Sequence, residues 1–378
     1  MLQGIKPTER ITAPKDWHPA ITFDGVSGEA TTKGMTGKPD FDEYLRDAGY
    51  DPETVEVVGN VRTSRWQRYD GEWLTAYRFN FTTRNPEIDL PLLWRTAKKQ
   101  LPKPPKVVES DKALIVALAD FQIGKVDERG GTQELIARVF KSFTRIEAQF
   151  KKGNYERIIL VDVGDIVEGF SNTADMNQAV TNDLSLMQQV DVAISLVWDL
   201  VKRACKFAPV TYVSIASNHC QFRLNKQRVG QVGKDDWGVM IAQQIHRLAL
   251  ETELPVTVKI PQPNDESLAL EVCGHIIGVV HGHQVNRPES FPDFWRKQAF
   301  GNQPISAATI CLSGHFHHLR VQELGDNGSN ASRYWIQAPT MDSGSGWYRL
   351  NSGEDSKTGI VCFEVEQDVP FTGTVWKF

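Results

Sequence analysis

Apolar and polar positions follow two periods along most of this chain. Beyond about residue 112, short continuous apolar runs alternate with stretches of helical periodicity. Such runs are typical of strands buried on both faces of a sheet, so the alternation predicts an α/β fold. The predicted strands are 113–119, 157–163, 209–216, 255–260, 268–272, 275–280, 308–313, 319–324, 332–337 and 359–365, and the predicted helices are 132–152, 183–206, 235–251 and 286–300.

The first hundred residues lack this alternation of apolar runs and helical patterns, and a chain of 378 residues is long enough for two domains. We expect an irregular arm over 1–38, followed by a small α+β accessory domain over 39–105. In that domain Asp40 is the expected N-cap of a short helix, and Asp70-Gly71 is the expected turn of a β-hairpin. A lysine- and proline-rich linker then leads into the catalytic domain over 106–378.

Composition narrows the class of protein. Hydrophobic residues make up 40% of the chain and charged residues 24%, which is an ordinary globular balance. There is no apolar run of the ~18 residues that a membrane span needs, and no apolar signal core, so we expect no membrane contact and a cytoplasmic location. Five scattered cysteines without a Cys-x-x-Cys pair indicate neither a disulfide framework nor a thiolate zinc site.

The net charge of −5 gives no global attraction to nucleic acid, so such binding requires a local basic patch. The accessory domain has one candidate, in which five arginines between residues 60 and 84 face only two acidic residues and alternate with aromatic residues. Aromatic and arginine side chains on a hairpin can hold a single strand by stacking and phosphate contact. The alternative is an aromatic core with a solvated arginine face. The arginines are Arg62, Arg65, Arg68, Arg78 and Arg84.

Polar residues that can bind metals follow five of the predicted strands. Six of the nine histidines fall in three such places, which a random distribution would not produce. Taken singly, each residue has a structural explanation as a turn, a helix cap or a core histidine. Taken together, at strand ends where α/β sheets place their sites, they indicate a metal site. The residues are Asp120, Gln122, Asp165, Asn218, His219, His281, His283, His315 and His317.

The order of these motifs (Asp-x-Gln, Gly-Asp, Asn-His, His and Gly-His-x-His) resembles the calcineurin-like metallophosphoesterase superfamily over about residues 111–365. Within that superfamily, the motifs most resemble those of phage-encoded and DNA-repair nuclease-type members. If the protein is phage-encoded, it would act in the cytoplasm of the host. The resemblance implies a four-layer α-β-β-α sandwich of two mixed sheets. It also implies two divalent metal ions at the strand ends, of which manganese is expected, with magnesium, zinc or iron as alternatives.

The resemblance also assigns roles to the residues. His219 would be the general acid or would donate a hydrogen bond to a phosphate oxygen, and a hydroxide held by the metals would attack the phosphorus. His315 and His317 lie two apart, so in extended backbone their side chains would point to the same side, yet the resemblance sends them to different ions. One ion would be held by Asp120, Gln122, Asp165 and His317, and the other by Asp165, Asn218, His281 and His315.

The chain departs from the family pattern in three places. Gln122 replaces a histidine, and its harder amide oxygen favours manganese or magnesium. Cys220 replaces the acidic residue that steadies the catalytic histidine, so that task would fall to another group. His281 and His283 compete for one ligand position, and we expect His281 to fill it. The candidates for the missing acidic group are Asp235, Asp236 and Glu168.

These features predict a phosphodiesterase or nuclease with nucleic acid, DNA in particular, as substrate. A basic loop after His219 could bind flanking phosphates or could be a solvated loop. The alternatives are a phosphomonoesterase or protein phosphatase with the same site, and a degenerate nucleic-acid-binding module. The basic residues of the loop are Arg223, Lys226, Arg228 and Lys234.

Overall fold

The computed structural model describes residues 21–23, 27–52, 55–83, 101–103, 105, 109–127, 129–170, 182–224, 227–326, 332–345, 349–350, 353 and 356–378. The chain divides into two compact units, Met1–Glu87 and Ile88–Phe378. The sequence placed the boundary further along, at 105–106. The proline-rich segment on which that boundary was based therefore belongs to the larger unit in this division, and residues 84–100 lie outside the described residues.

The N-terminal unit is a four-stranded antiparallel sheet with one short helix. Its strands lie in the order β1-β2-β4-β3, and α1 lies between β2 and β3 in the chain. The expected irregular arm over 1–38 is wrong in part, because it contributes β1 and β2. Both are too short for an alternating pattern to show, and β2 is held by pairing with β4. The bounds are β1 Ile21–Phe23, β2 Ser27–Thr31, α1 Phe41–Asp47, β3 Val55–Gln67 and β4 Trp73–Thr83.

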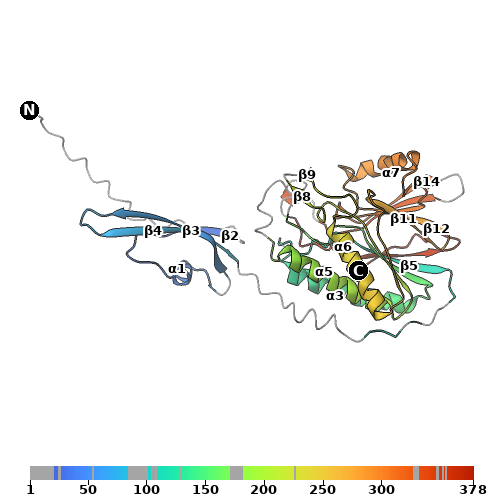
Figure 1. Cartoon of the computed structure of the whole chain (residues 1–378), viewed down its shortest axis with the longest axis horizontal. Coiled ribbons are helices and arrows are strands. Elements are labelled where there is room, and N and C mark those ends of the chain that lie inside the picture. Colours follow the sequence, from blue (N-terminus) through green and yellow to red (C-terminus); the bar gives the residue numbers. More distant parts are fainter. Residues whose placement is uncertain are drawn as a thin grey trace, which may run out of the picture. The chain divides into compact units, whose positions relative to one another are not determined.

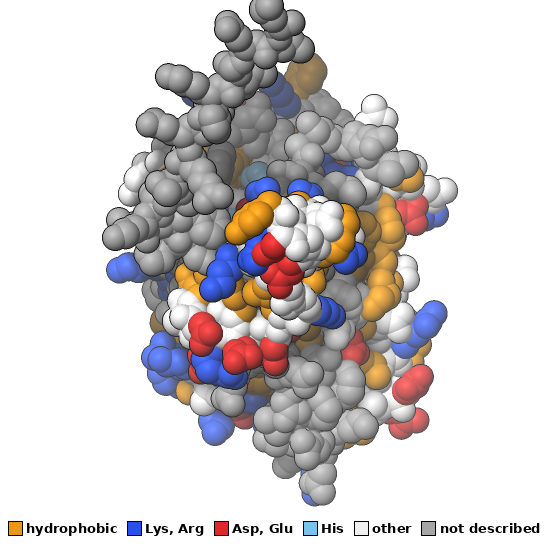
Figure 2. All heavy atoms as spheres, turned by 90° about the vertical axis from the view of Figure 1, so that its left-hand side faces the viewer, with side chains coloured by type: hydrophobic (Ala, Val, Ile, Leu, Met, Phe, Trp, Pro, Cys, Tyr) orange, Lys and Arg blue, Asp and Glu red, His pale blue; other side chains and the backbone are white. Residues whose placement is uncertain are grey.

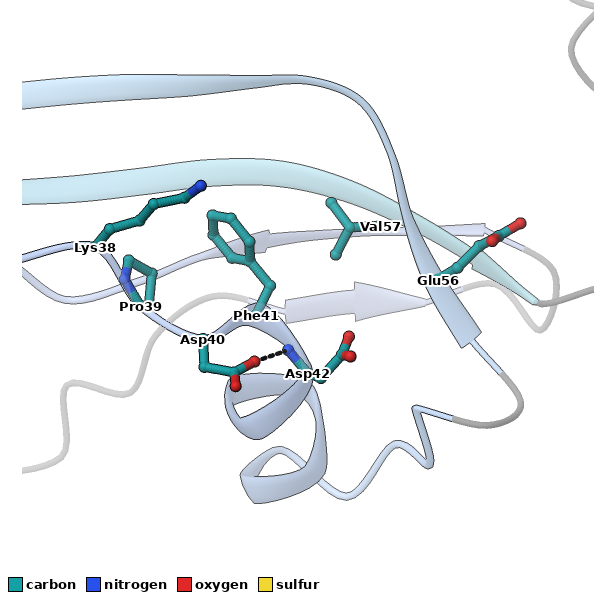
Figure 3. A pocket seen from close by; sticks show the side chains of 7 residues that line it. All are labelled: Lys38, Pro39, Asp40, Phe41, Asp42, Glu56 and Val57. Carbon is teal, nitrogen blue, oxygen red and sulfur yellow. Dashed lines mark hydrogen bonds between the residues drawn. The ribbon is translucent and has the colours of Figure 1, made fainter.

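A small aromatic core holds this unit together. Phe79 and Phe81 on β4 are buried with Leu45 of α1 and Ala30 of β2. As expected, Asp40 caps α1, because its carboxylate accepts a hydrogen bond from the backbone N–H of Asp42 at 2.9 Å. A shallow hollow opens beside this cap, between the start of α1 and β3 (Figure 3). Phe79 and Phe81 of β4 therefore belong to the core of this unit, in agreement with the alternative in which the aromatic residues of the hairpin are core.

The turn end of the hairpin is different, because its aromatic side chains are exposed. Trp66, Tyr69 and Trp73 are 42%, 93% and 50% exposed, and Arg65 lies over the Trp73 ring at 5.0 Å. Figure 2 looks toward this end of the hairpin, where hydrophobic, basic and acidic side chains lie side by side. Arg68 pairs with Asp70 and Glu72 at the turn, so part of the arginine charge is neutralised within the hairpin.

The larger unit contains two mixed sheets packed face to face. The first has the order β10-β7-β6-β5-β16-β17, in which β5, β6, β7 and β10 are parallel and β16 runs antiparallel to β5. The continuous apolar runs explain this sheet, because both of its faces are covered. Its strands are β5 Lys112–Leu118, β6 Arg157–Asp162, β7 Val210–Ser214, β10 Val256–Lys259, β16 Val361–Glu366 and β17 Trp376–Lys377.

The second sheet has the order β11-β12-β13-β15-β14. Its three inner strands are parallel, and the two edge strands are antiparallel to their neighbours. A two-stranded ribbon, β8 with β9, lies outside both sheets. The bounds are β11 Ser267–Val272, β12 His275–Val280, β13 Ile310–Ser313, β14 Arg320–Asp326, β15 Ser332–Gln337, β8 Arg223–Leu224 and β9 Gln227–Arg228.

Helices cover the outer faces of both sheets, so the larger unit has the four layers α-β-β-α that were expected. Three helices pack on the outer face of the first sheet, and α7 packs on the outer face of the second (Figure 1). A separate apolar core fills the space between the two sheets. The helices are α3 Thr132–Lys152, α5 Leu186–Ala204, α6 Trp237–Thr252 and α7 Phe291–Phe300, the last preceded by a 3-10 turn at Pro288–Ser290.

Candidate metal centre

The loops that follow five parallel strands meet at one end of the sandwich. In the first sheet these loops follow β5, β6 and β7, and in the second they follow β12 and β13. Hydrogen bonds join the two sheets there, two of them from histidines of the second sheet. The backbone N–H of His315 donates to Asp120 Oδ2 at 2.9 Å, and His281 Nδ1 lies 2.8 Å from the carbonyl oxygen of Val163. The predicted site residues are therefore brought together from both sheets.

The backbone at these positions is unusual. Nine non-glycine residues in the described part of the chain have positive φ, and five of them are predicted metal ligands. Left-handed backbone costs free energy for residues with a Cβ, and such residues cluster at functional sites. The expectation that His315 and His317 extend from the strand toward the same side is therefore wrong. The five residues are Asp120, Gln122, Asp165, His315 and His317, with φ between 45° and 69°.

Two glycines allow the loops to come this close. At Gly314, an added Cβ would lie 2.6 Å from Asp120 Oδ2. At Gly164, which has a φ of 105°, it would lie 2.6 Å from His281 Nδ1. Neither contact leaves room for a side chain, so both glycines are required by the close approach of the two sheets.

Three of the predicted ligands form a compact group of donor atoms. Atoms of Asp165, His281 and His315 all lie within 4.8 Å of one another, and Asp165 Oδ2 is 2.9 Å from His281 Nε2. The chain neighbours of Asn218, Ser217 and His219, both form hydrogen bonds with Asp165, and Asn218 Oδ1 is buried and has no hydrogen-bond partner among the described residues. A buried amide oxygen left alone is costly, so it fits a metal ligand. We call the four residues Asp165, Asn218, His281 and His315 the Asp165 side of the site.

The protonation of two members of this group suits a cation, whereas the third is protonated without one: burial lowers the pKa of His281, but Asp165 and Asp120 raise it to about 9, so a metal ion would have to displace that proton. Burial raises the pKa of Asp165, but His281, His219 and His315 lower it well below its ordinary value. Burial and the neighbouring His281 lower the pKa of His315 to about 3. A carboxylate and a neutral imidazole are the forms in which these side chains bind metals. The Asp165 side therefore fits one divalent ion.

His283 lies near this group but is engaged elsewhere. Its Nε2 is 3.4 Å from Glu266 Oε2, while the ring of His281 contacts Asp165 directly. Burial raises the pKa of Glu266, but His283 and Arg228 lower it to a net value of about 2. His281, and not His283, is thus placed beside the other donors of the Asp165 side.

The other predicted ligand set is arranged differently. His317 Nε2 lies 3.4 Å from Asp120 Oδ1, an atom that makes no hydrogen bond within the described chain. Gln122, however, is occupied by Lys125, whose Nζ donates to Gln122 Oε1 at 2.8 Å and to Asp342 Oδ2 at 2.6 Å. We call the five residues Asp120, Gln122, Lys125, His317 and Asp342 the Gln122 side. Its amide oxygen, expected to hold a metal, accepts a hydrogen bond from an ammonium instead.

Within the Gln122 side, Asp342 also contacts His317, whose Nδ1 lies 3.5 Å from Asp342 Oδ2. Burial raises the pKa of Asp342, while His317 and Lys125 lower it below its ordinary value. Burial lowers the pKa of Lys125, but Asp342 and Glu168 raise it to a net value above the ordinary one. Both partners are therefore charged, and the pair is nearly excluded from solvent, since the Lys125 and Asp342 side chains are 17% and 1% exposed.

His219 stands between the two sides. Its Nδ1 lies 3.1 Å from Glu168 Oε2, so of the three acidic residues considered for the role left open by Cys220, Glu168 contacts the imidazole. Burial lowers the pKa of His219, while Glu168 and Asp165 raise it to a net value above the ordinary one. The Gln122 Nε2 amide at 3.1 Å from His219 Nε2 acts in the opposite direction, because an amide N–H can donate only to an unprotonated ring nitrogen.

Three residues of the site were missed by sequence reasoning: Lys125, Asp342 and Glu266. Asp342 follows the parallel strand β15, so the rule that found the other ligands would also have found it. Its backbone N–H is held by Thr340 Oγ1, which also donates to the carbonyl oxygen of Asp120. Neither Lys125 nor Glu266 directly follows a predicted strand, so the same rule would not have found them.

The basic loop after His219 is partly neutralised. Arg228 pairs with Glu266, and Arg223 donates to Gln221 Oε1 at 3.3 Å. Lys226 lies outside the described residues.

Comparisons with known proteins find weak structural similarity alone. No protein-family profile matches the chain, and no curated protein matches it. A conserved uncharacterized protein from Streptococcus pneumoniae TIGR4, a predicted phosphoesterase, is 12% identical over 71% of this chain and 99% of its own, with a TM-score of 0.27. A purple acid phosphatase from yellow lupin (Lupinus luteus) seeds is 9% identical over 95% of this chain and 73% of its own, with a TM-score of 0.30. None of the described helices is long and apolar enough to cross a membrane.

Proposed function

We propose that this protein is a metal-dependent phosphoesterase. The observation that carries the proposal is the Asp165 side of the site. There a carboxylate and two imidazoles from both sheets place donor atoms within 4.8 Å of one another, next to a buried amide oxygen without a partner. Oxygen and nitrogen donors in a partly open site suit a catalytic divalent ion. Manganese is the ion that we propose, because the donors include amide and carboxylate oxygens.

A divalent ion held there would polarise a phosphoryl oxygen and lower the pKa of a bound water. The chain supplies the remaining parts. The imidazole of His219 is held at Nδ1 by Glu168, so Nε2 is the atom that would give a proton to the leaving oxygen, after the substrate displaces the Gln122 amide that lies 3.1 Å from this nitrogen. The Asp165 carboxylate accepts the backbone N–H of His219 at 2.9 Å, which fixes the imidazole relative to the metal ligands. Lys125 adds a positive charge on the Gln122 side.

We further propose that the substrate is a phosphodiester in nucleic acid, DNA in particular. What supports this is the N-terminal unit, where exposed Trp66, Tyr69 and Trp73 can stack with bases. Arg78 and, to a smaller extent, Arg62 lower the pKa of Glu29, and Arg65 lies over the Trp73 ring at 5.0 Å. Among the described residues, however, neither Arg62 nor Arg65 forms an ion pair within 4.0 Å, so their charges can meet phosphates. A single strand needs this combination of flat surfaces and positive charge.

The test measures turnover of four substrates in the presence of manganese. They are single-stranded DNA, double-stranded DNA, bis-p-nitrophenyl phosphate and p-nitrophenyl phosphate. Turnover of DNA and of the diester is expected. Turnover of the monoester without the diester would sink the nuclease proposal and favour a phosphomonoesterase or protein phosphatase. No turnover of any substrate, with no bound metal, would favour a binding module.

A further inference from the structure

We propose that Lys125 replaces one of the two metal ions, so that the chain binds a single divalent ion tightly and uses a buried ammonium as its second cation. The inference rests on the proposed metal-dependent function. It departs from the two-ion site that the sequence predicted, and it assigns a role to a residue that no motif marked.

The contacts of Lys125 are the first step. Its Nζ donates to Gln122 Oε1 at 2.8 Å and to Asp342 Oδ2 at 2.6 Å. An ammonium has only donors, so the oxygen of the Gln122 amide must face it. This orientation turns Gln122 Nε2 toward His219 Nε2, at 3.1 Å, where it can donate. The amide is thus fixed at both ends and presents no free oxygen to a metal.

The remaining donors form an incomplete set. Without Gln122, the Gln122 side offers Asp120 and His317, whose facing atoms are 3.4 Å apart, because Asp342 is paired with Lys125. Asp165 was expected to serve both ions, but its Oδ2 lies 2.9 Å from His281 Nε2 and its Oδ1 accepts the backbone N–H of His219 at 2.9 Å. Catalytic metal sites generally have three protein ligands or more. A metal ion on this side would also be repelled by the nearby ammonium.

The charges support the same conclusion. Lys125 Nζ lies 2.6 Å from Asp342 Oδ2, so the ammonium already compensates the buried carboxylate that it contacts on the Gln122 side. Buried charges need such compensation, and the Lys125–Asp342 pair is nearly excluded from water.

The experiment counts metal ions and does not depend on turnover. The full-length protein is stripped with a chelator and titrated with manganese by isothermal titration calorimetry, and the metal retained after gel filtration is measured by mass spectrometry. We expect one tightly bound ion per chain, with any second ion bound at least about 100-fold more weakly. Two ions of similar affinity would overturn the proposal.

Three variants test whether Lys125 determines the number of bound ions. Lys125→Met combined with Gln122→His removes the ammonium and restores an imidazole, so it should bind two ions. Lys125→Arg keeps the charge and should still bind one. Lys112→Met, which removes a lysine paired with Glu366 at the start of β5, is the matched control and should not change the count. A double variant that folds by circular dichroism and still binds one ion would contradict the role of Lys125.

The wild-type count decides the question even if the Lys125 variants fail to fold, because two equivalent ions would exclude the proposal by themselves. The outcomes also separate this inference from the proposed function. One bound ion with no hydrolysis of any phosphoester would contradict the function and leave the count intact. Hydrolysis with two ions of similar affinity would do the reverse, and no bound ion would overturn both.

Discussion

The two sides of the site occupy the same end of the sandwich and are built from the same kinds of residues, yet they differ in what they lack. On the Asp165 side, the donor atoms of Asp165, His281 and His315 face one another, and Asn218 Oδ1 has no partner in the described chain. On the Gln122 side, Lys125 already links Gln122 to Asp342. Each side has a buried oxygen without a partner in the described chain, Asn218 Oδ1 on one and Asp120 Oδ1 on the other, but the Gln122 side already contains the Lys125 ammonium.

The difference shows that position at a strand end does not determine whether a residue binds metal. Asp120, Gln122 and Asp165 follow neighbouring parallel strands and share left-handed backbone. The two amides differ in their partners: Gln122 Oε1 accepts a hydrogen bond from Lys125 Nζ at 2.8 Å, whereas Asn218 Oδ1 has no partner in the described chain. Buried atoms without partners are therefore better indicators of a metal ligand than the motif alone.

The largest effect is expected from Asp165→Asn, because this change removes the central carboxylate of the Asp165 side. Bound metal should fall to background, and phosphodiester turnover should fall on the order of 10³-fold or more, since metal catalysis contributes several kcal/mol. Turnover and metal content are measured together. Asp293→Asn on the exposed surface of α7 is the control, and both quantities should match the wild type. Full metal retention in Asp165→Asn would contradict the assignment.

Next in size is His219→Ala, which removes the proposed proton donor but no metal ligand. Turnover should fall about 10²- to 10⁴-fold, the usual range for general acid catalysis, while bound metal stays unchanged. His246→Ala, an exposed histidine on α6, should have no effect on either. Loss of metal from His219→Ala would show that the imidazole is a ligand.

A smaller effect is expected for Gln122→Ala, and it contrasts the two amides directly. Since the Gln122 oxygen is bound by Lys125, its removal should leave the metal content unchanged and lower turnover about 10- to 100-fold, through the loss of support for His219. Asn218→Ala, the matched change on the other side, should release the ion. If the two variants lose equal amounts of metal, the distinction between the sides is wrong.

Much of the larger unit could be predicted from the sequence, because its physical cause is local. Each continuous apolar run became a strand of one of the two sheets, and the helical patterns became α3, α5, α6 and α7. Parallel strands place their carboxyl ends at one edge, so the meeting of Asp120, Asp165 and Asn218 followed from strand order alone.

What could not be predicted depends on contacts between distant residues. Lys125 and Asp342 are 217 residues apart, and no pattern near either residue indicates the pair. The left-handed backbone of His315 and His317 results from loops that the two sheets force together, whereas the sequence suggested a continuing strand. The two strands β1 and β2 are likewise set by pairing with neighbours and not by their own short patterns.

The smallest effect is expected from Glu266→Gln, which tests why His283 stays away from the Asp165 side. Because His283 and Arg228 lower the pKa of Glu266 to about 2, below the 4.5 of an unperturbed glutamate, its stabilising effect is present above pH 4.5 and is lost as the pH falls toward 2. The variant should be less stable than the wild type by about 1 kcal/mol at pH 7, the scale of a partly exposed ion pair, and the difference should disappear near pH 2. Urea unfolding of both proteins across this range measures it. A difference that is constant with pH would mean that Glu266 stabilises the fold by packing alone, leaving the position of His283 to the backbone after β12.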